Sequence, residues 1–203
     1  MKYEMEGIRK ILIHRIQKHY PVRMSDYEQI MKEPGTAAAA AFTLSPHPNE
    51  VLKLFWECDV QHCLPVAFYE ATVRGVNSLS SSSPNVSLPS QILPRAVKAL
   101  GSCNSKVADH VRSALEPVRN CRKCASRSFV GVEHALLPIK VDLSVSPLRD
   151  PHSKPEIIAA LCETCAAEFL SEDRAFKCAF WSELPEMFGL STWTELSKLV
   201  VLK

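Results

Sequence analysis

Hydrophobic residues recur at steps of three and four along most of the chain, which is the spacing of an amphipathic helix. The first such segment covers residues 3–20. Its apolar face consists of Met5, Ile8, Leu12 and Ile16. Pro21 ends it, and Ser25 is placed to cap a short second helix that runs to Met31. The pattern predicts a mainly helical protein.

The segment from Pro48 to Gly75 predicts a helical hairpin. Asp59–Gln61 separates two apolar faces, and Gly75 is suited to end the second helix. These faces consist of Val51, Leu54, Phe55 and Cys58, then Leu64, Phe68 and Ala71. An alanine run at residues 37–41 precedes the hairpin, and a serine-rich stretch at residues 76–89 follows it. We interpret both as linkers between helical regions.

More helices are predicted beyond this second linker. Ser90 caps a helix that Gly101 ends, and Pro117 ends the next one. Residues 125–154 show little periodicity, apart from one alternating stretch that is either a short strand or extended chain.

Two capping boxes mark helices in the last quarter of the chain. The first, Ser153–Glu156, opens a helix whose apolar positions continue through Cys162 and Cys165 as far as Pro185. The second, Thr192–Glu195, opens a short last helix.

Composition places the chain among globular proteins. It has 203 residues, 46% of them hydrophobic, and a net charge of +2, so it can bury a core and does not indicate an electrostatic trap for nucleic acid. It has no apolar run of about 18 residues and no secretory signal at its start, which predicts no membrane span. We expect the cytoplasm or nucleus, where its eight cysteines are thiols or metal ligands rather than disulfides.

Two Cys-x-x-Cys pairs carry the strongest chemical signal. The first is Cys121 with Cys124, and the second is Cys162 with Cys165. Together they supply the four thiolates of a closed, tetrahedral structural zinc site. Four thiolates around a divalent ion leave a local charge of about minus two, which nearby cations can offset. These cations are Arg119, Arg122, Lys123 and Arg127.

Other interpretations of these pairs stay open. Cys162 and Cys165 can be small buried residues without metal, or one pair can be a redox couple, although no βαβ pattern accompanies it. Residues 125–161 separate the pairs, more than the roughly 12–20 residues usual in zinc fingers and ribbons. His134 and His152 are either substitute ligands or exposed loop residues.

The remaining cysteines and aromatic residues predict packing. We interpret Cys58, Cys63, Cys103 and Cys178 as small buried hydrophobic residues. A dense aromatic group near the C-terminus is either the end of a hydrophobic core or an exposed docking patch. It consists of Phe180, Trp181, Phe188 and Trp193. A Cys–His nucleophile using His110 or His134 has no supporting motif, and no phosphate-binding glycine loop is present. We therefore expect no catalysis.

The segments "KYEMEGIRKIL", "HYPVRMSDYE" and "PNEVLKLFWECDVQHCLPVAFYEAT" occur in that order. They resemble the region that follows the BTB/POZ core in a family expanded in mushroom-forming fungi. The matching positions are Glu57, Val60, Leu64, Pro65, Ala67, Phe68 and Tyr69, and near the C-terminus Cys162, Cys165, Trp181, Leu184, Pro185 and Phe188. The BTB core itself is expected before "KYEMEG" and is missing, so BTB dimerisation and ligase recruitment are not assigned to these residues.

The resemblance implies a BACK-like helical adaptor region that presents a surface to other proteins. We therefore predict an all-α fold of stacked helical hairpins. Residues 1–75 form the BACK-like region, residues 76–89 a linker and residues 90–203 a C-terminal subdomain that zinc can pin. The predicted function is a non-enzymatic protein-interaction module. The alternatives are a zinc-dependent nucleic-acid-binding protein and a cysteine- or metal-dependent hydrolase. The oligomeric state is left open.

Overall fold

The computed structural model describes residues 7, 11, 13–32, 48–73, 88–125, 148 and 155–201. Within these ranges the protein is all-α, as predicted, and contains no strand. None of the described helices is both long enough and apolar enough to cross a membrane. The alanine run, most of the serine-rich stretch, residues 126–147, His134 and His152 lie outside the described residues.

The predicted hairpin is present. Helix α4 (Pro48–Glu57) is followed by a short 3-10 helix, η1 (Gln61–Cys63), and then by α5 (Leu64–Val73). Asp59 makes the turn with a positive φ of 55°, a conformation that Asp adopts more readily than most residues. Every residue of α5 is buried, because α4, α7 and α11 all pack against it. Helix α2 (Met24–Lys32) begins one residue before the predicted cap, Ser25.

Helix α7 (Ile92–Asn120) is continuous, so the predicted ends at Gly101 and Pro117 are wrong. Gly101 is exposed, and glycine in a helix costs only about 1 kcal/mol relative to alanine. That cost is small beside the burial of apolar side chains on both sides of Gly101. Pro117 lies in the last turns, where the helix continues only to Asn120. The predicted cap at Ser90 is also wrong, because Gln91 occupies the N-cap position.

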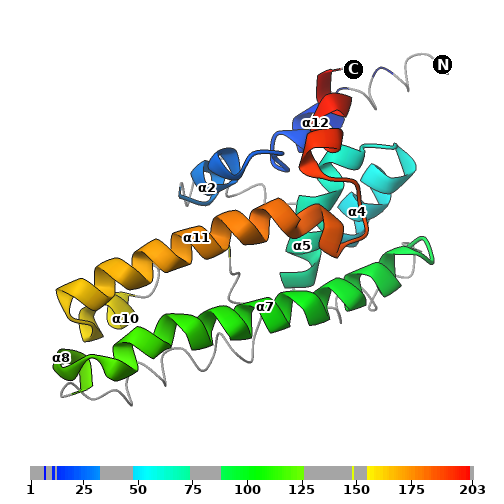
Figure 1. Ribbon diagram of the computed structural model, residues 1–203. Coiled ribbons are helices and arrows are strands. Elements are labelled where there is room, and N and C mark those ends of the chain that lie inside the picture. The colour runs from blue at the N-terminus through cyan, green and yellow to red at the C-terminus, as the bar shows by residue number, and fades with distance from the viewer. Residues whose placement is uncertain are drawn as a thin grey trace.

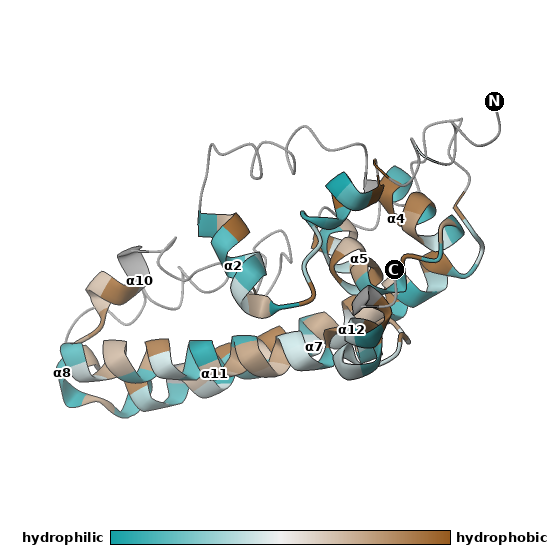
Figure 2. Cartoon of the chain, turned by 90° about the horizontal axis from the view of Figure 1, so that it is seen from above, coloured by the Kyte–Doolittle hydropathy of each residue, from teal (hydrophilic) through white to brown (hydrophobic). Residues whose placement is uncertain are grey.

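Helix α11 (Glu163–Met187) lies antiparallel to α7 (Figure 1), and these two helices make the most extensive contact between elements. It passes through Pro185, where the sequence predicted its end, and finishes two residues later. Figure 2 shows α11 lying along α7 from above, with hydrophilic and hydrophobic residues alternating along its length. The short helices α8 (Arg122–Ala125) and α10 (Pro155–Ala160) lie at one end of this pair.

Two hydrophobic clusters stabilise the helices. The larger contains residues from both sides of the serine-rich stretch, including Phe55, Phe68, Ile92 and Phe180. The smaller lies between α7, α8 and the start of α11. Its buried members are Val107, Val111, Ala114, Val118, Cys124, Leu161, Cys165 and Phe169. The second cluster therefore joins the part of the chain before residue 125 to the part after residue 155.

The C-terminal aromatic group closes the larger cluster, in agreement with the first of its two interpretations. Phe180, Trp181 and Phe188 are buried, and the rings of Trp181 and Trp193 stack with centroids 5.1 Å apart. The Trp193 indole N–H donates to the Trp181 carbonyl at 2.6 Å. Helix α12 (Trp193–Val201) opens with the predicted capping box, in which the Thr192 N–H donates to Glu195 and the Glu195 N–H donates to the Thr192 hydroxyl.

Candidate metal centre

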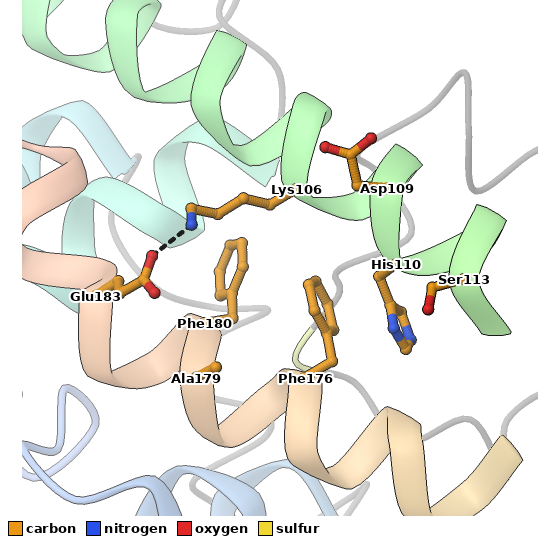
Figure 3. Close-up of a pocket in the computed structure, with 8 residues that line it drawn as sticks. All are labelled: Lys106, Asp109, His110, Ser113, Phe176, Ala179, Phe180 and Glu183. Carbon is orange, nitrogen blue, oxygen red and sulfur yellow. Dashed lines mark ion pairs between the residues drawn. The ribbon is translucent and has the colours of Figure 1, made fainter. Parts of the chain in front are cut away.

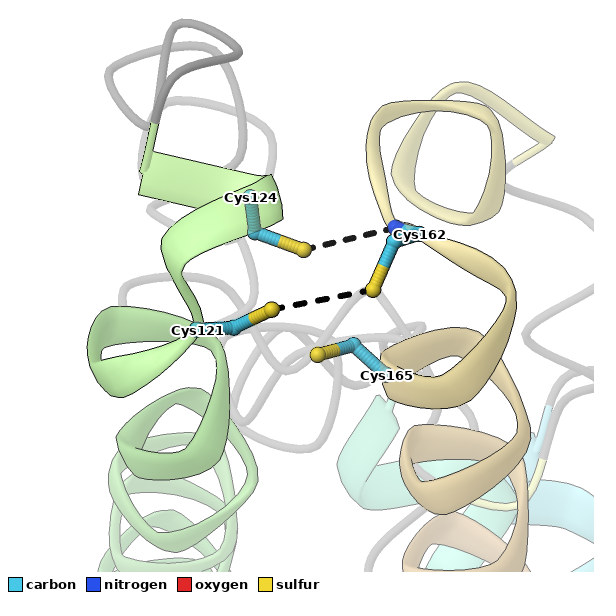
Figure 4. Close-up of side chains that lie close together, drawn as sticks. All are labelled: Cys121, Cys124, Cys162 and Cys165. Atoms are coloured by element: carbon cyan, nitrogen blue, oxygen red, sulfur yellow. Dashed lines mark hydrogen bonds between the residues drawn. The ribbon is translucent and has the colours of Figure 1, made fainter.

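The four cysteines of the two pairs lie at the shared end of α7 and α11. Cys121 is the C-cap of α7, and Cys124 follows it in the single turn of α8. Cys162 is the N-cap of α11, and Cys165 lies in its first turn. Figure 4 shows the first pair facing the second across the gap between the two helices. The structure thus brings together the four residues that the sequence predicted as ligands.

A break in the chain before α11 sets the position of the second pair. The sequence predicted one helix through Cys162, but α10 ends at Ala160 and Cys162 has extended backbone with ψ of 160°. The Ala166 N–H then bonds to the Cys162 carbonyl at 2.8 Å, which starts α11. Because Cys162 is outside the helix, its thiol is not restricted to the helical step that relates it to Cys165.

The distances fit a metal ion bound by four thiolates. All four sulfur atoms lie within 4.8 Å of one another. The Cys121 and Cys162 Sγ atoms are 3.7 Å apart. A tetrahedron with metal–sulfur bonds of about 2.3 Å has edges of about 3.8 Å. Disulfide sulfurs are only about 2.05 Å apart, and all eight cysteines are free thiols here. The group can hold a metal ion.

The electrostatics of the cluster favour thiolate at Cys162. The interaction of its sulfur with the Cys165 backbone N–H is the largest effect and lowers the pKa of Cys162 to about 7. The Cys162 N–H, 3.3 Å from the Cys124 sulfur, acts to lower the pKa of Cys124, but burial and the thiols of Cys162 and Cys121 raise it on balance. Desolvation raises the pKa of Cys165 strongly. A cation is what would let all four thiols ionise together.

Burial divides the ligands into an inner and an outer pair. Cys124 and Cys165 are 2% and 4% exposed and belong to the smaller hydrophobic cluster. Cys121 and Cys162 are half-buried. Of the cations that the sequence analysis expects to offset the charge of the thiolates, Arg119, Arg122 and Lys123 are exposed, while Arg127 lies outside the described residues. The site is therefore dry on the side facing the helices and open to solvent on the other.

The other four cysteines are divided in their environments. Cys63 and Cys103 are buried, as predicted, and burial raises the pKa of Cys103 to about 11. Cys58 is half-buried against the larger cluster. Cys178 is exposed, so the prediction of a buried thiol is wrong there. Its neighbour Lys177 faces inward on α11, and the next position on a helix is rotated by about 100°.

A group of polar side chains between α7 and α11, formed by His110, Asp173 and Lys177, was not predicted from the sequence. The Lys177 ammonium lies 2.8 Å from the Asp173 carboxylate, and the His110 Nε2 atom lies 3.7 Å from the same group. The His110 ring stacks on Phe176 with centroids 4.1 Å apart. Figure 3 shows His110 and Phe176 lining an open groove that Lys106 and Glu183 bridge with an ion pair. The spacing of Asp173 and Lys177 is a sequence signal for a helical ion pair.

In the part of the chain that the structure describes, the four-cysteine group is the one cluster of three or more Cys, His, Asp or Glu residues with metal-binding geometry. No protein-family model, no curated protein and no solved structure matches the chain. The resemblance to the region after a BTB/POZ core therefore stays a prediction.

Proposed function

We propose that the protein is a non-enzymatic protein-interaction module whose α7–α11 pair is pinned by a structural zinc ion on Cys121, Cys124, Cys162 and Cys165. The observation that carries this proposal is the cluster of four sulfur atoms within 4.8 Å, contributed by two segments far apart in sequence. The adaptor role, of the kind found in BTB-type regulatory proteins, follows from the resemblance described above.

Zinc is the metal that best suits this ligand set. A tetrahedral set of four thiolates is typical of zinc or an iron–sulfur centre, and a single ion matches sulfur atoms this close together. Four protein ligands also complete the coordination of zinc, whereas a catalytic zinc keeps one position for water or substrate. The donor set thus supports a structural role and argues against a metal-dependent hydrolase.

The zinc ion with its four cysteine ligands, which we call the zinc clamp, would hold together one end of the molecule. The smaller hydrophobic cluster has eight buried members, and two of them are the ligands Cys124 and Cys165. The short helices beside it, α8 and α10, contain only four and six residues, too few to be stable alone. A metal ion bound across the two segments stabilises this end of the molecule and keeps the exposed faces of α7 and α11 in one arrangement. Those faces are the surface that we assign to a partner.

Affinity purification with a matched pair of variants tests the adaptor role. The full chain, Cys165→Ser and Cys178→Ser serve as baits in cells. Cys178 is exposed and outside the cluster, so Cys178→Ser is expected to retain the same partners as the full chain. Cys165→Ser is expected to lose those that depend on the pinned helices. A bait that retains no protein above background, or partners shared equally by both variants, contradicts the proposal. The cytoplasm or nucleus is part of the proposal, because a reducing compartment keeps cysteine thiols available as metal ligands.

Nucleic-acid binding is the second candidate, and one observation favours it. Arg119, Arg122 and Lys123 are all exposed beside the cysteine cluster. A few phosphate contacts give weak binding that falls steeply with salt. This alternative is supported if the protein is retained on DNA or RNA and Arg122→Glu weakens that retention. The affinity of the variant should also depend less on salt concentration than the affinity of the parent. Binding that is absent at low salt excludes it.

A further inference from the structure

The four thiols of the cluster differ in their exposure to solvent, and a purely structural zinc site does not require this difference. Cys124 and Cys165 are almost fully buried, whereas Cys121 and Cys162 are half-buried and reachable from solvent. A small dissolved oxidant therefore meets the outer pair first. The sulfur atoms of these two residues face each other across the gap between α7 and α11, 3.7 Å apart.

The backbone leaves the outer pair room to move. Cys121 has extended backbone with φ of −83° and ψ of 115°, and Cys162 has extended backbone as well. Both are cap residues at the ends of their helices, so their backbone is less constrained than that of residues inside a helix. A disulfide needs the two sulfurs to approach by about 1.7 Å, to about 2.05 Å. Cys124 and Cys165, in contrast, are held inside helices and in the apolar cluster.

We propose that the clamp is redox-sensitive: a hydroperoxide oxidises Cys121 and Cys162 to a disulfide, and the zinc ion is released. This inference rests on the proposed zinc clamp. It assigns the outer pair to a regulatory role and the inner pair to a purely structural one.

The chemistry balances with hydrogen peroxide as the oxidant. One outer thiolate attacks a peroxide oxygen, the O–O bond breaks, and a sulfenic acid and hydroxide form. The facing thiolate then attacks the sulfenic sulfur, the S–S bond forms, and a second hydroxide leaves. Two thiolates give up two electrons, and the peroxide is reduced to two hydroxide ions. Zinc has no redox chemistry of its own and loses two of its four ligands.

The product differs from a simple loss of metal. A bond between Cys121 and Cys162 still links the end of α7 to the start of α11, while Cys124 and Cys165 remain thiols. The α7–α11 pair is therefore expected to stay together, and α8 loses the attachment that the metal gave it. Oxidation would alter the surface around α8 without unfolding the molecule.

Peroxide titration of the zinc-loaded Cys178→Ser variant tests the inference. This background removes the exposed thiol, which would otherwise form disulfides between molecules. Zinc release is followed with a chromogenic chelator, and the remaining thiols are then alkylated. Trypsin cuts at Arg122 and Lys123, and a Glu-specific protease cuts after Glu163. The four cysteines then lie on separate peptides, so unreduced mass spectrometry identifies each disulfide.

We expect release of about one zinc ion per chain, with the Cys121–Cys162 disulfide as the main product and alkylated Cys124 and Cys165. Thiol reductant and added zinc should restore the starting state. Disulfides within Cys121–Cys124 or Cys162–Cys165 would overturn the inference. The inference would also be overturned if zinc stayed bound at peroxide concentrations that oxidise the exposed Cys178 of the parent chain. That result would not contradict the zinc clamp itself. A protein purified without zinc instead contradicts the clamp itself.

Discussion

Replacement of Cys165 by serine is the change that most clearly separates a metal clamp from a packed pair of thiols. The side chain is 4% exposed and belongs to the smaller hydrophobic cluster. If it only packs, Cys165→Ser buries a hydroxyl in place of a thiol and costs on the order of 1 kcal/mol. If it binds zinc, the substitution also removes the stabilisation that the bound ion supplies.

The size of this second effect follows from mass action. At a free zinc concentration about 1,000 times the dissociation constant, binding stabilises the folded state by about 4 kcal/mol. In a protein of this length each kcal/mol corresponds to a shift of about 2–4 °C in melting temperature. The two losses together amount to about 5 kcal/mol, so the Cys165→Ser variant should melt about 10–20 °C below the parent in zinc. In excess chelator the two should differ by only a few degrees.

Cys103→Ser is the matched control. Cys103 is 2% exposed, lies on α7 and packs in the larger cluster, with its sulfur 3.7 Å from that of Met187. The same chemical change there should cost on the order of 1 kcal/mol, equally with and without chelator. Thermal melts of the three proteins by far-ultraviolet circular dichroism, in zinc and in chelator, provide the comparison. A parent melting temperature that chelation leaves unchanged refutes the metal-clamp reasoning.

Other parts of the structure give independent predictions. Chelation should raise amide hydrogen exchange in the second half of α7 and the first half of α11 but leave α5 protected, which hydrogen-exchange mass spectrometry measures. An equal increase in exchange in all three helices would contradict a clamp that acts at one end of the molecule. Gly101→Ala should raise the melting temperature by about 2–4 °C, because the added methyl meets nothing within 4 Å on a helical backbone, and a lower value would be inconsistent with the continuous α7. Asp173→Asn should cost about 3 kcal/mol in chemical denaturation because it leaves the Lys177 ammonium buried without its partner, whereas Lys177→Met should cost little; equal losses would argue against a buried charge pair. Trp193→Phe should cost about 1 kcal/mol in the same assay by removing the indole donor, and no loss would show that the bond is not stabilising.

Local signals in the sequence were sufficient to predict those features of the fold that depend on residues close together in the chain. The capping box at Thr192–Glu195 forms as predicted, since its hydrogen bonds join residues three apart. The hairpin turn at Asp59 and the helical hydrophobic spacing of α4 and α5 are likewise local. These features required no knowledge of distant contacts.

Tertiary packing decided the helix ends that the sequence missed. Gly101 and Pro117 are usual helix-ending signals, but α7 continues through both because its inner face packs along α11. The break at Cys162 is the opposite case: the apolar spacing is continuous there, and the chain leaves the helix where the second thiol pair faces the first. Periodicity describes one segment at a time and has no information on such long-range contacts.

The cluster of four cysteines was predictable in its members but not in its internal differences. Two Cys-x-x-Cys pairs identify the ligand types, yet only the fold distinguishes the buried Cys124 and Cys165 from the accessible Cys121 and Cys162. The exposed position of Cys178 shows the same limit, because neighbouring apolar residues did not reveal the direction of its side chain.

Quantitative elemental analysis of the untagged protein, combined with native mass spectrometry, tests the central claim most directly. The account predicts about one zinc ion per chain, retained through gel filtration and lost in Cys165→Ser but not in Cys103→Ser. Zinc well below one equivalent, iron in its place, or equal zinc in both variants would contradict it.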